Sequence, residues 1–132
     1  MLHHGRHGIE VGDDARAVRI SLRGSVLAES TRAKVLRERG LPPRRYLPPE
    51  DVRMELLEPS ETTSECPFKG VASYWHVRVG DELHHDVVWS YPDAEQEGEP
   101  VRGLFAFFDE RVDVDLDGER QDRPLTRWSI DT

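Results

Sequence analysis

The sequence predicts a mostly β fold: a compact, single-domain antiparallel β structure, tent-like or barrel-like, with seven to eight strands and one or two short helices. Apolar and polar residues alternate in several short segments, which is the period of half-buried strands. Turn-forming residues separate those segments. A chain of 132 residues also fits one domain. We expect residues 1–15 to form a flexible tail and residues 16–132 to form the domain.

The first half of the chain begins with a predicted hairpin. Val18, Ile20 and Leu22 share one face of a strand, and a turn at Gly24 leads into a return strand over residues 25–29. Residues 30–39 are compatible with a helix or with a further strand. Residues 44–47 predict a short extended piece, residues 52–58 resume the alternation, and residues 59–65 predict a polar loop.

Residues 71–91 predict a second hairpin whose register the pattern leaves open. A two-residue turn at Gly80-Asp81 has glycine where a type II′ turn requires it. A three-residue loop instead sets Val79 opposite Leu83 and Trp75 opposite Val87. Burial specifies register strongly, since a slip of one residue inverts every side chain. We therefore favour the three-residue loop.

The last third predicts two more strands. Residues 104–108 form a continuous apolar run, which favours a strand buried on both faces. Residues 112–116 alternate valine or leucine with aspartate, as in an edge strand guarded by outward charges. Trp128 and Ile130 are expected to dock the C-terminal segment.

Composition limits the function classes. The net charge of −8 argues against non-specific nucleic-acid binding, which requires basic groups. No stretch approaches the roughly 20 apolar residues of a membrane span. Cys66 is the single cysteine, which excludes an intrachain disulfide and a four-cysteine zinc site. We expect a cytoplasmic protein. Basic residues gather in 30–53 and acidic ones in 81–122, a distribution that a solvated, internally complementary surface explains.

Several motifs between residues 48 and 92 carry a resemblance. They are Pro48-Pro49-Glu50-Asp51-Val52-Arg53-Met54, Leu57-Glu58-Pro59-Ser60, Cys66-Pro67-Phe68-Lys69-Gly70, Ala72-Ser73-Tyr74-Trp75 and Trp89-Ser90-Tyr91-Pro92. In this order they resemble a widespread bacterial family, domain of unknown function 427, over roughly residues 16–116. The resemblance implies a compact β domain related to tent-shaped β folds. It implies little about activity.

That family is sometimes labelled a nucleotidyltransferase, and the label can be compared with the residues. Such enzymes pair a Gly-Ser turn with an Asp-x-Asp that holds Mg²⁺. Gly24-Ser25 and Asp113-Val114-Asp115 are present but far apart, and the first resembles a hairpin turn. Solvated edge charges explain the two aspartates equally well. The residues therefore favour a protein that is not an enzyme.

Cys66 and Lys69 are the catalytic candidates, because an ammonium group near a thiol lowers its pKa and raises its nucleophilicity. The favoured alternative is that Cys66 packs as a small hydrophobe. His76 faces Asp86 in one hairpin register and His85 in the other, which leaves a hydrogen-bonded pair or a metal chelate open; we expect no metal. If a pocket exists, aromatic and polar residues of this region should line it: Tyr46, Asp51, Arg53, Cys66, Lys69, Tyr74, Trp75, Trp89 and Tyr91.

The function that these observations favour is a small β domain that binds a small molecule or a protein partner, without a cofactor. One alternative is an enzyme acting on a nucleotide-like substrate through Cys66 and Lys69 or through a carboxylate-bound metal. Another is a scaffold that associates with itself, for example as a homodimer.

Overall fold

The computed structural model describes residues 3–4 and 8–129, which form two antiparallel sheets. The larger sheet has the strand order β1-β2-β5-β6-β10-β9-β8-β7, and the smaller has the order β12-β11-β3-β4. The strands are β1 (His3–His4), β2 (Ile9–Asp14), β3 (Val18–Leu22), β4 (Ser25–Ser30), β5 (Ala33–Glu38), β6 (Arg44–Leu47), β7 (Leu57–Cys66), β8 (Gly70–Val79), β9 (Glu82–Ser90), β10 (Phe105–Phe107), β11 (Asp113–Leu116) and β12 (Glu119–Arg120). The predicted mostly β, single-domain fold is confirmed.

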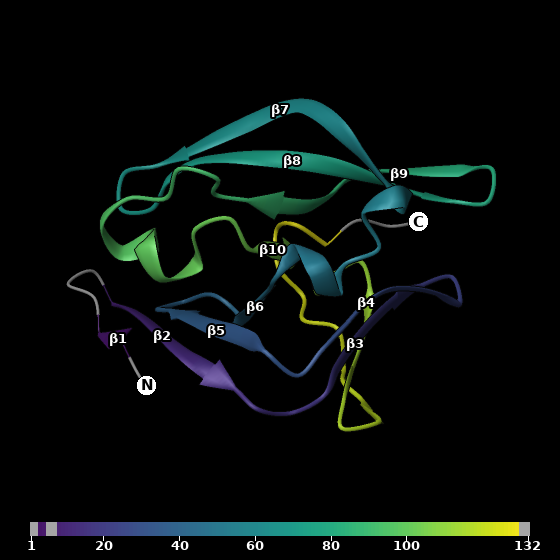
Figure 1. The fold of residues 1–132 in the computed structure, drawn as a ribbon, viewed down its shortest axis with the longest axis horizontal. Coiled ribbons are helices and arrows are strands. Elements are labelled where there is room, and N and C mark those ends of the chain that lie inside the picture. Colours follow the sequence, from purple (N-terminus) through teal and green to yellow (C-terminus); the bar gives the residue numbers. More distant parts are fainter. Residues whose placement is uncertain (1–2, 5–7, 130–132) are drawn as a thin grey trace.

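The larger sheet curves strongly. Figure 1 shows its two ends on opposite sides of the view, with β7 and β8 at the top and β2 and β5 at the bottom. Strands β3 and β4 of the smaller sheet lie at the lower right. In each sheet the first and the last strand do not pair with each other. Among the described strands, both sheets are therefore open and not closed into a barrel.

The central strands of the larger sheet are buried on both faces, because successive side chains point to opposite sides. Leu47, Val88 and Phe107 join a core cluster shared with the smaller sheet. Tyr46, Trp89 and Ala106, which directly precede or follow them, join a second cluster on the other face. The prediction that residues 104–108 form a strand buried on both faces is confirmed for β10.

The structure corrects or resolves four local expectations. Residues 9–14, assigned to a flexible tail, form β2, which pairs with β5 along its whole length and buries Ile9 and Val11; residues 1–2 and 5–7 of that tail lie outside the described part. Residues 30–39 contain strand β5 rather than a helix. The expected loop at 59–65 belongs to edge strand β7, while residues 52–58 begin with short helical turns.

The register of the second hairpin differs from the favoured one. Val79 pairs with Glu82 across a Gly80-Asp81 turn, so the two-residue turn is correct, and Gly80 has the positive φ of +59° that such a turn requires. Beyond Val77 a bulge at Asp86 shifts the pairing, so that Trp75 lies opposite Val88. The bulge brings Val87 and Val88, which are adjacent in the chain, into the same core cluster, which a regular strand would send to opposite faces.

The helices are three 3₁₀ segments: η1 (Pro49–Asp51), η2 (Met54–Leu56) and η3 (Gln96–Val101). Among the described residues, no helix has the length and apolar character needed to cross a membrane. Segment η3 packs against the β7–β8 turn, where the Glu97 amide donates to the Phe68 carbonyl at 2.9 Å.

Gly98 allows this close approach and provides a first prediction. A Cβ at Gly98 would lie 2.8 Å from the Lys69 carbonyl oxygen and 2.9 Å from the Lys69 Cα, both backbone atoms. Gly98→Ala should therefore displace η3 or the turn and lower the free energy of unfolding by roughly 1–3 kcal/mol. Urea denaturation measures this. The exposed Glu99→Ala in the same helix is the control; equal stability of the two variants would contradict the prediction.

Asp14 provides a second prediction, on pH dependence. It is buried at the end of β2 and accepts hydrogen bonds from the Arg16 side chain at 2.8 and 2.9 Å and from Arg45 at 3.3 Å. The hydrogen bonds from Arg16 are the main cause that lowers the pKa of Asp14 from 3.8 to about 2. A carboxyl whose pKa is lower in the folded state stabilises the fold above its unfolded pKa. This stability, about 1–2 kcal/mol, should be lost as the pH falls from about 4 to 2.

Urea midpoints of the parent protein and Asp14→Asn at pH 5.5 and pH 2.5 test this prediction. The asparagine variant should be the less stable one at pH 5.5, and the gap should shrink to less than half at pH 2.5. A gap of the same size at both values would show that the carboxylate charge contributes nothing.

Candidate functional site

A cavity of about 360 Å³ opens on the sheet face that carries Tyr46 and Trp89. We call it the aromatic pocket. Its aromatic lining consists of Tyr46, Tyr74, Trp89, Tyr91, Phe108 and Trp128, and its polar lining of Glu38, Arg44, Ser64, Glu65, Cys66, Lys69 and Arg127. The volume and the mixture of aromatic walls with a few polar groups are typical of small-molecule sites.

The period of the central strands explains why the aromatic residues gather here. Tyr46 on β6 and Trp89 on β9 point to the same face of the sheet, as does Phe108 directly after β10. The Trp89 Nε1 donates a hydrogen bond to the Tyr46 hydroxyl at 3.0 Å, and its ring lies 4.5 Å from that of Phe108. Trp128 of the C-terminal segment reaches the same cluster, 6.1 Å from Phe108.

Arg44 forms the buried base of the pocket. Its guanidinium carbon lies 5.4 Å from the Trp89 ring, 5.5 Å from the Phe108 ring and 5.6 Å from the Trp128 ring. Three aromatic faces around one cation stabilise it by cation–π attraction. The same contacts with Arg44 hold the indole and phenyl rings in a fixed arrangement, which preorganises the wall of the pocket.

Glu110 neutralises the charge of Arg44. Its two oxygens accept from Arg44 Nη1 at 2.6 Å and Nη2 at 2.9 Å, and Thr126 donates to it at 2.5 Å. Burial alone would raise the pKa of Glu110, but the hydrogen bonds from Arg44 and Thr126 outweigh it and hold that pKa below its usual range. The paired Arg44 is therefore not free to bind an anionic ligand.

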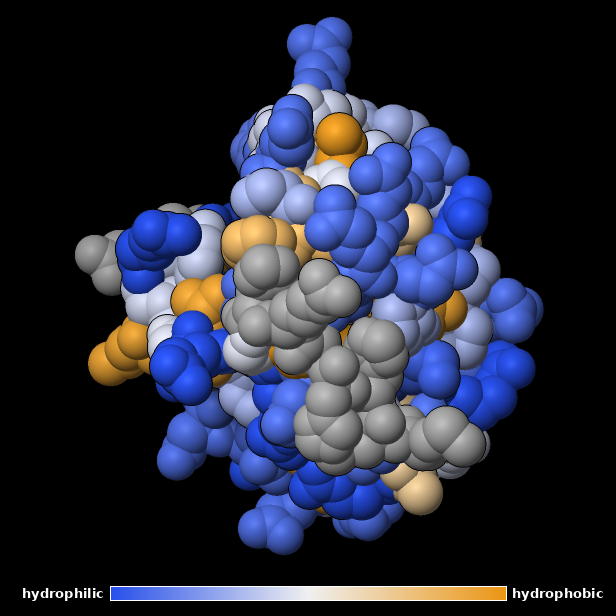
Figure 2. Space-filling view, turned by 90° about the vertical axis from the view of Figure 1, so that its left-hand side faces the viewer, coloured by the Kyte–Doolittle hydropathy of each residue, from blue (hydrophilic) through white to orange (hydrophobic). Residues whose placement is uncertain are grey.

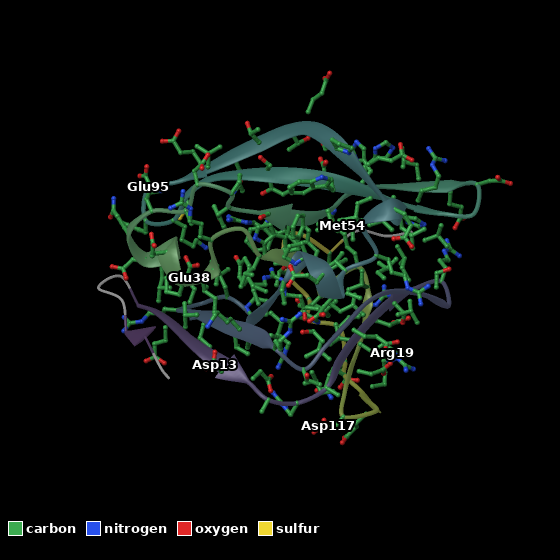
Figure 3. All side chains as sticks on the ribbon, viewed as in Figure 1. Asp13, Arg19, Glu38, Met54, Glu95 and Asp117 are labelled. Atoms are coloured by element: carbon green, nitrogen blue, oxygen red, sulfur yellow. The ribbon has the colours of Figure 1, made fainter. Side chains whose placement is uncertain are left out.

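Lys69 and Glu38 form the charged rim. Lys69 Nζ lies 2.9 Å from Glu38 Oε1 and 5.4 Å from the centre of the Tyr91 ring. Figure 3 places Glu38 on the side of the molecule where η3 lies. No contact of Lys69 with the Cys66 thiol occurs among the described residues, so the ammonium group stabilises a carboxylate rather than a thiolate.

Tyrosine hydroxyls supply the hydrogen-bonding groups of the pocket. Burial raises the pKa of Tyr91, and the neighbouring Tyr46 and Cys66 raise it further, so its hydroxyl stays protonated at neutral pH. Within the described part of the chain, this hydroxyl has no hydrogen bond to another residue. The Tyr74 hydroxyl lies 2.8 Å from Ser64 Oγ. The pocket therefore offers a spare donor at Tyr91 beside apolar ring faces.

The structure brings six of the nine ligand-binding candidates together in this pocket: Tyr46, Cys66, Lys69, Tyr74, Trp89 and Tyr91. The other three lie elsewhere. Trp75 points to the opposite face of the sheet and packs against Phe105 at 4.9 Å. Arg53 precedes η2, where its amide donates to the Leu27 carbonyl at 2.8 Å.

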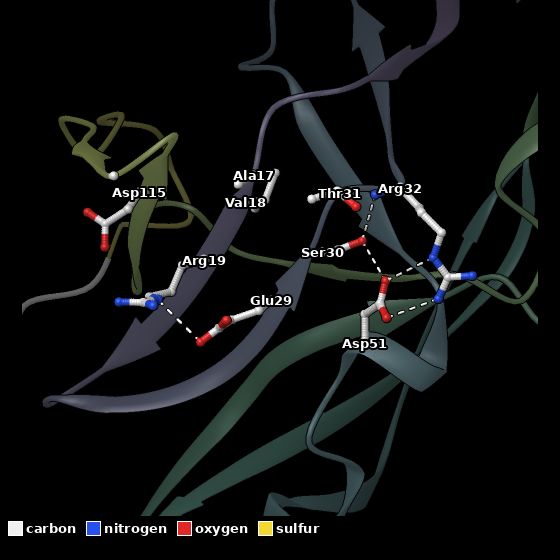
Figure 4. A pocket seen from close by; sticks show the side chains of 10 residues that line it. Ala17, Val18, Arg19, Glu29, Ser30, Thr31, Arg32, Asp51 and Asp115 are labelled. Atoms are coloured by element: carbon white, nitrogen blue, oxygen red, sulfur yellow. Dashed lines mark hydrogen bonds and ion pairs between the residues drawn. The ribbon is translucent and has the colours of Figure 1, made fainter.

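Asp51 lines a different hollow, of about 470 Å³, at the ends of β3 and β4. Figure 4 shows its carboxylate accepting hydrogen bonds from Ser30 at 2.6 Å and from Arg32 at 3.0 and 3.3 Å, while Arg19 and Glu29 form a separate ion pair. These partners compensate the charges of the hollow, so its polar groups are engaged by the protein itself.

The remaining chemical candidates are also paired. His76 Nδ1 accepts a hydrogen bond from the Asp86 amide at 3.1 Å, and its ring lies 4.7 Å from that of His85. Asp113 and Asp115 form ion pairs with Arg123 and Arg120. In the described ranges, no group of three or more histidine, cysteine, aspartate or glutamate side chains is placed to hold a metal ion.

Sequence reasoning missed Arg44, Glu38 and Glu110 as parts of the site. The alternation of residues 104–108 placed Phe108 on the face opposite Phe105 and Phe107, a signal that could have identified it. Trp128 and Ile130 were expected to dock the C-terminal segment; Trp128 does so through Phe108, and Ile130 lies outside the described residues. Nothing local marks Arg44 as the partner of Glu110, because 66 positions separate them.

Comparison with known families gives one match. A family model described as "Domain of unknown function (DUF427)" matches residues 10–118. The match includes β3 to β11 and every aromatic wall of the pocket except Trp128. A search of curated proteins found no match.

Proposed function

Because this chain belongs to the family described as domain of unknown function DUF427, a description that names no activity, we propose its function from the aromatic pocket: it binds a small molecule there. The ligand class that fits is a compact planar ring carrying one or two hydrogen-bonding groups. The spare Tyr91 hydroxyl carries this proposal, because it lines the pocket and bonds no other described residue, so a ligand acceptor can replace the water that reaches it.

The geometry supports a planar ligand in two further ways. The ring faces of Tyr91 and Trp89 line a cavity of about 360 Å³, a size suited to one or two fused rings. The rim pair of Lys69 and Glu38 presents both signs of charge, so it favours a neutral or zwitterionic molecule over a strongly charged one. Aromatic stacking then supplies affinity, and the hydroxyl group supplies orientation.

Two other functions receive less support. A catalytic role for Cys66 requires an activating base or cation, and Lys69 is instead paired with Glu38. Self-association through an apolar surface requires a contiguous patch. The large hydrophobic residues exposed in the described part come from four separate segments: Leu41, Met54, Val71 and Leu125. The face in Figure 2 is mostly hydrophilic, with small separate hydrophobic areas.

Cys66 provides the test, because its half-buried thiol lines the pocket. The native protein is treated with iodoacetamide in the presence of planar probes such as adenine, nicotinamide or indole. A bound probe should slow alkylation of Cys66 and raise the melting temperature. At one hundred times its dissociation constant a ligand stabilises the fold by about 2.7 kcal/mol.

Tyr91→Phe is the decisive variant, since it removes the spare hydroxyl and no protein hydrogen bond of the described residues. It should keep the parent stability and lose most of the protection by probes. Trp75→Phe, which changes an aromatic residue on the opposite face, should leave protection unchanged. The proposal would be rejected if protection of Cys66 persisted in Tyr91→Phe, or if none of the planar probes protected Cys66 in the parent protein.

We also propose a cytoplasmic location, supported by the free thiol of Cys66.

A further inference from the structure

A second cavity, of about 540 Å³, lies between the β3–β4 turn, the β8–β9 hairpin and the segment after β10. We call it the arginine hollow. Its polar lining consists of Arg23, His84, His85, Arg111, Asp113 and Arg123. Three arginines therefore face one aspartate, in a protein whose net charge is −8. Such a local reversal of sign concentrates anions at that place.

Arg111 is the principal group of the hollow. Its Nε donates to the Trp128 carbonyl at 3.0 Å, and its Nη1 donates to the carbonyls of Asp86 at 3.2 Å and His85 at 3.4 Å. These bonds and the Phe108 ring, 4.7 Å below the guanidinium carbon, fix its plane. Among the described residues, Arg111 has no carboxylate partner, and its Nη2 has no acceptor. Glu110 and Asp86 lie near enough to attract the Arg111 cation, but neither is bonded to its guanidinium, so Nη2 is available to an acceptor from outside the protein.

His84 adds a second group without a hydrogen-bond partner. Its Nε2 is buried and makes no hydrogen bond among the described residues, although Glu82 Oε1 lies 3.4 Å away in a poor orientation. Glu82 is already shared with Arg23, whose Nε lies 3.4 Å from the same oxygen. An acceptor atom inside the hollow would complete the hydrogen bonding of His84.

Most of the remaining charges around the hollow are paired. Asp113 is bound by Arg123 at 3.1 Å and by Arg120 at 3.6 Å, so its carboxylate is compensated. The nearby Asp86 accepts a hydrogen bond from Thr62 at 2.8 Å through one oxygen, while its other oxygen, 3.5 Å from His76 Nδ1, is buried and makes no hydrogen bond among the described residues. Leu22, Leu83 and Val87 form the apolar part of the lining.

We propose that the arginine hollow is a second binding site, for a compact oxyanion, a phosphate monoester or a carboxylate, that carries a short apolar group. The oxyanion accepts from the free Nη2 of Arg111 and from His84, and Arg123 adds a positive charge at the rim. A planar guanidinium suits both phosphate and carboxylate oxygens. The apolar group lies against Leu83 and Val87. This site shares no lining residue with the aromatic pocket.

Titration of the full-length protein with phenyl phosphate and with benzoate, followed by NMR, tests the proposal. Benzyl alcohol is the uncharged control. The side-chain resonances of His84 and His85 should shift with one or both anions, and not with benzyl alcohol or an equal ionic strength of NaCl. The anion that binds with the lower dissociation constant shows whether the site prefers a phosphate monoester or a carboxylate.

Arg111→Gln should weaken anion binding at least tenfold, and the more exposed Arg123→Gln should weaken it two- to fivefold. Arg102→Gln, in the loop after η3, should change nothing. If Arg111→Gln does not fold, Arg123→Gln decides alone. Equal binding by Arg123→Gln and Arg102→Gln, or shifts caused by NaCl alone, would overturn the proposal. Tyr91→Phe should leave anion binding unchanged, so failure here is distinguishable from failure of the aromatic pocket.

Discussion

Glu110→Ala is expected to lower the free energy of unfolding by about 3–5 kcal/mol, the range for breaking a buried ion pair from one side. The Glu110 carboxyl has no exposed surface, and the Arg44 side chain is 8% exposed. Removing the carboxylate leaves the guanidinium buried without a counter-charge, apart from Asp109 at 3.5 Å. Three aromatic rings surround the cation, but they do not replace the bidentate hydrogen bonds.

Urea denaturation of Glu110→Ala, Glu110→Gln and the double variant Arg44→Met/Glu110→Leu measures this loss. Glu110→Gln keeps the shape and removes the charge, so it should lie between the parent and Glu110→Ala. The double variant should recover much of the stability, because replacing both partners with apolar groups removes the desolvation penalty. The exposed pair of Arg78 and Glu58 is the control, and Glu58→Ala should change the midpoint little.

A small loss in Glu110→Ala, similar to that of Glu58→Ala, would contradict the buried pair. A double variant that is no more stable than Glu110→Ala would instead show that the pair contributes more than its desolvation costs. Either result can be read from the same set of urea midpoints.

Trp89→Ala is expected to cost about 3–5 kcal/mol, while Trp75→Ala should cost clearly less. Trp89 is 6% exposed, packs against Phe108 at 4.5 Å and donates a hydrogen bond to Tyr46. Trp75 is only half-buried and contacts Phe105 at 4.9 Å. The structure separates them, because they belong to opposite faces of the larger sheet.

Tyr46→Phe isolates the hydrogen bond within this cluster. It leaves the Trp89 Nε1 without an acceptor and should cost about 1–3 kcal/mol. Chemical denaturation followed by far-UV circular dichroism, which does not depend on tryptophan emission, measures all three variants. Equal losses in Trp89→Ala and Trp75→Ala would show that the two faces are equally buried and that the assignment of Trp89 to the pocket wall is wrong.

The sequence by itself determined the local alternation. The period of two in Val18, Ile20 and Leu22 gave strand β3, and the run at residues 104–108 gave a strand buried on both faces. Gly80 was compatible with the two-residue turn that the structure contains, but the burial argument favoured a three-residue loop and was wrong. These features depend on neighbours in the chain, since backbone geometry alone sends successive side chains to opposite faces. Of the six proposed residues that do line the pocket, Tyr46, Tyr74, Trp89 and Tyr91 followed from aromatic content, and Cys66 and Lys69 from their proximity in the chain.

Only the tertiary structure decided which strands are neighbours and which distant side chains meet. Residues 9–14 carry a weak pattern, yet they form β2 because β5 offers six consecutive partners. The bulge at Asp86 changed the register of β9, since burial of both Val87 and Val88 outweighs a regular ladder. Arg44 and Glu110, 66 positions apart, meet only because β6 and β10 are neighbours. A pocket depends on such distant pairings, and no local periodicity encodes them.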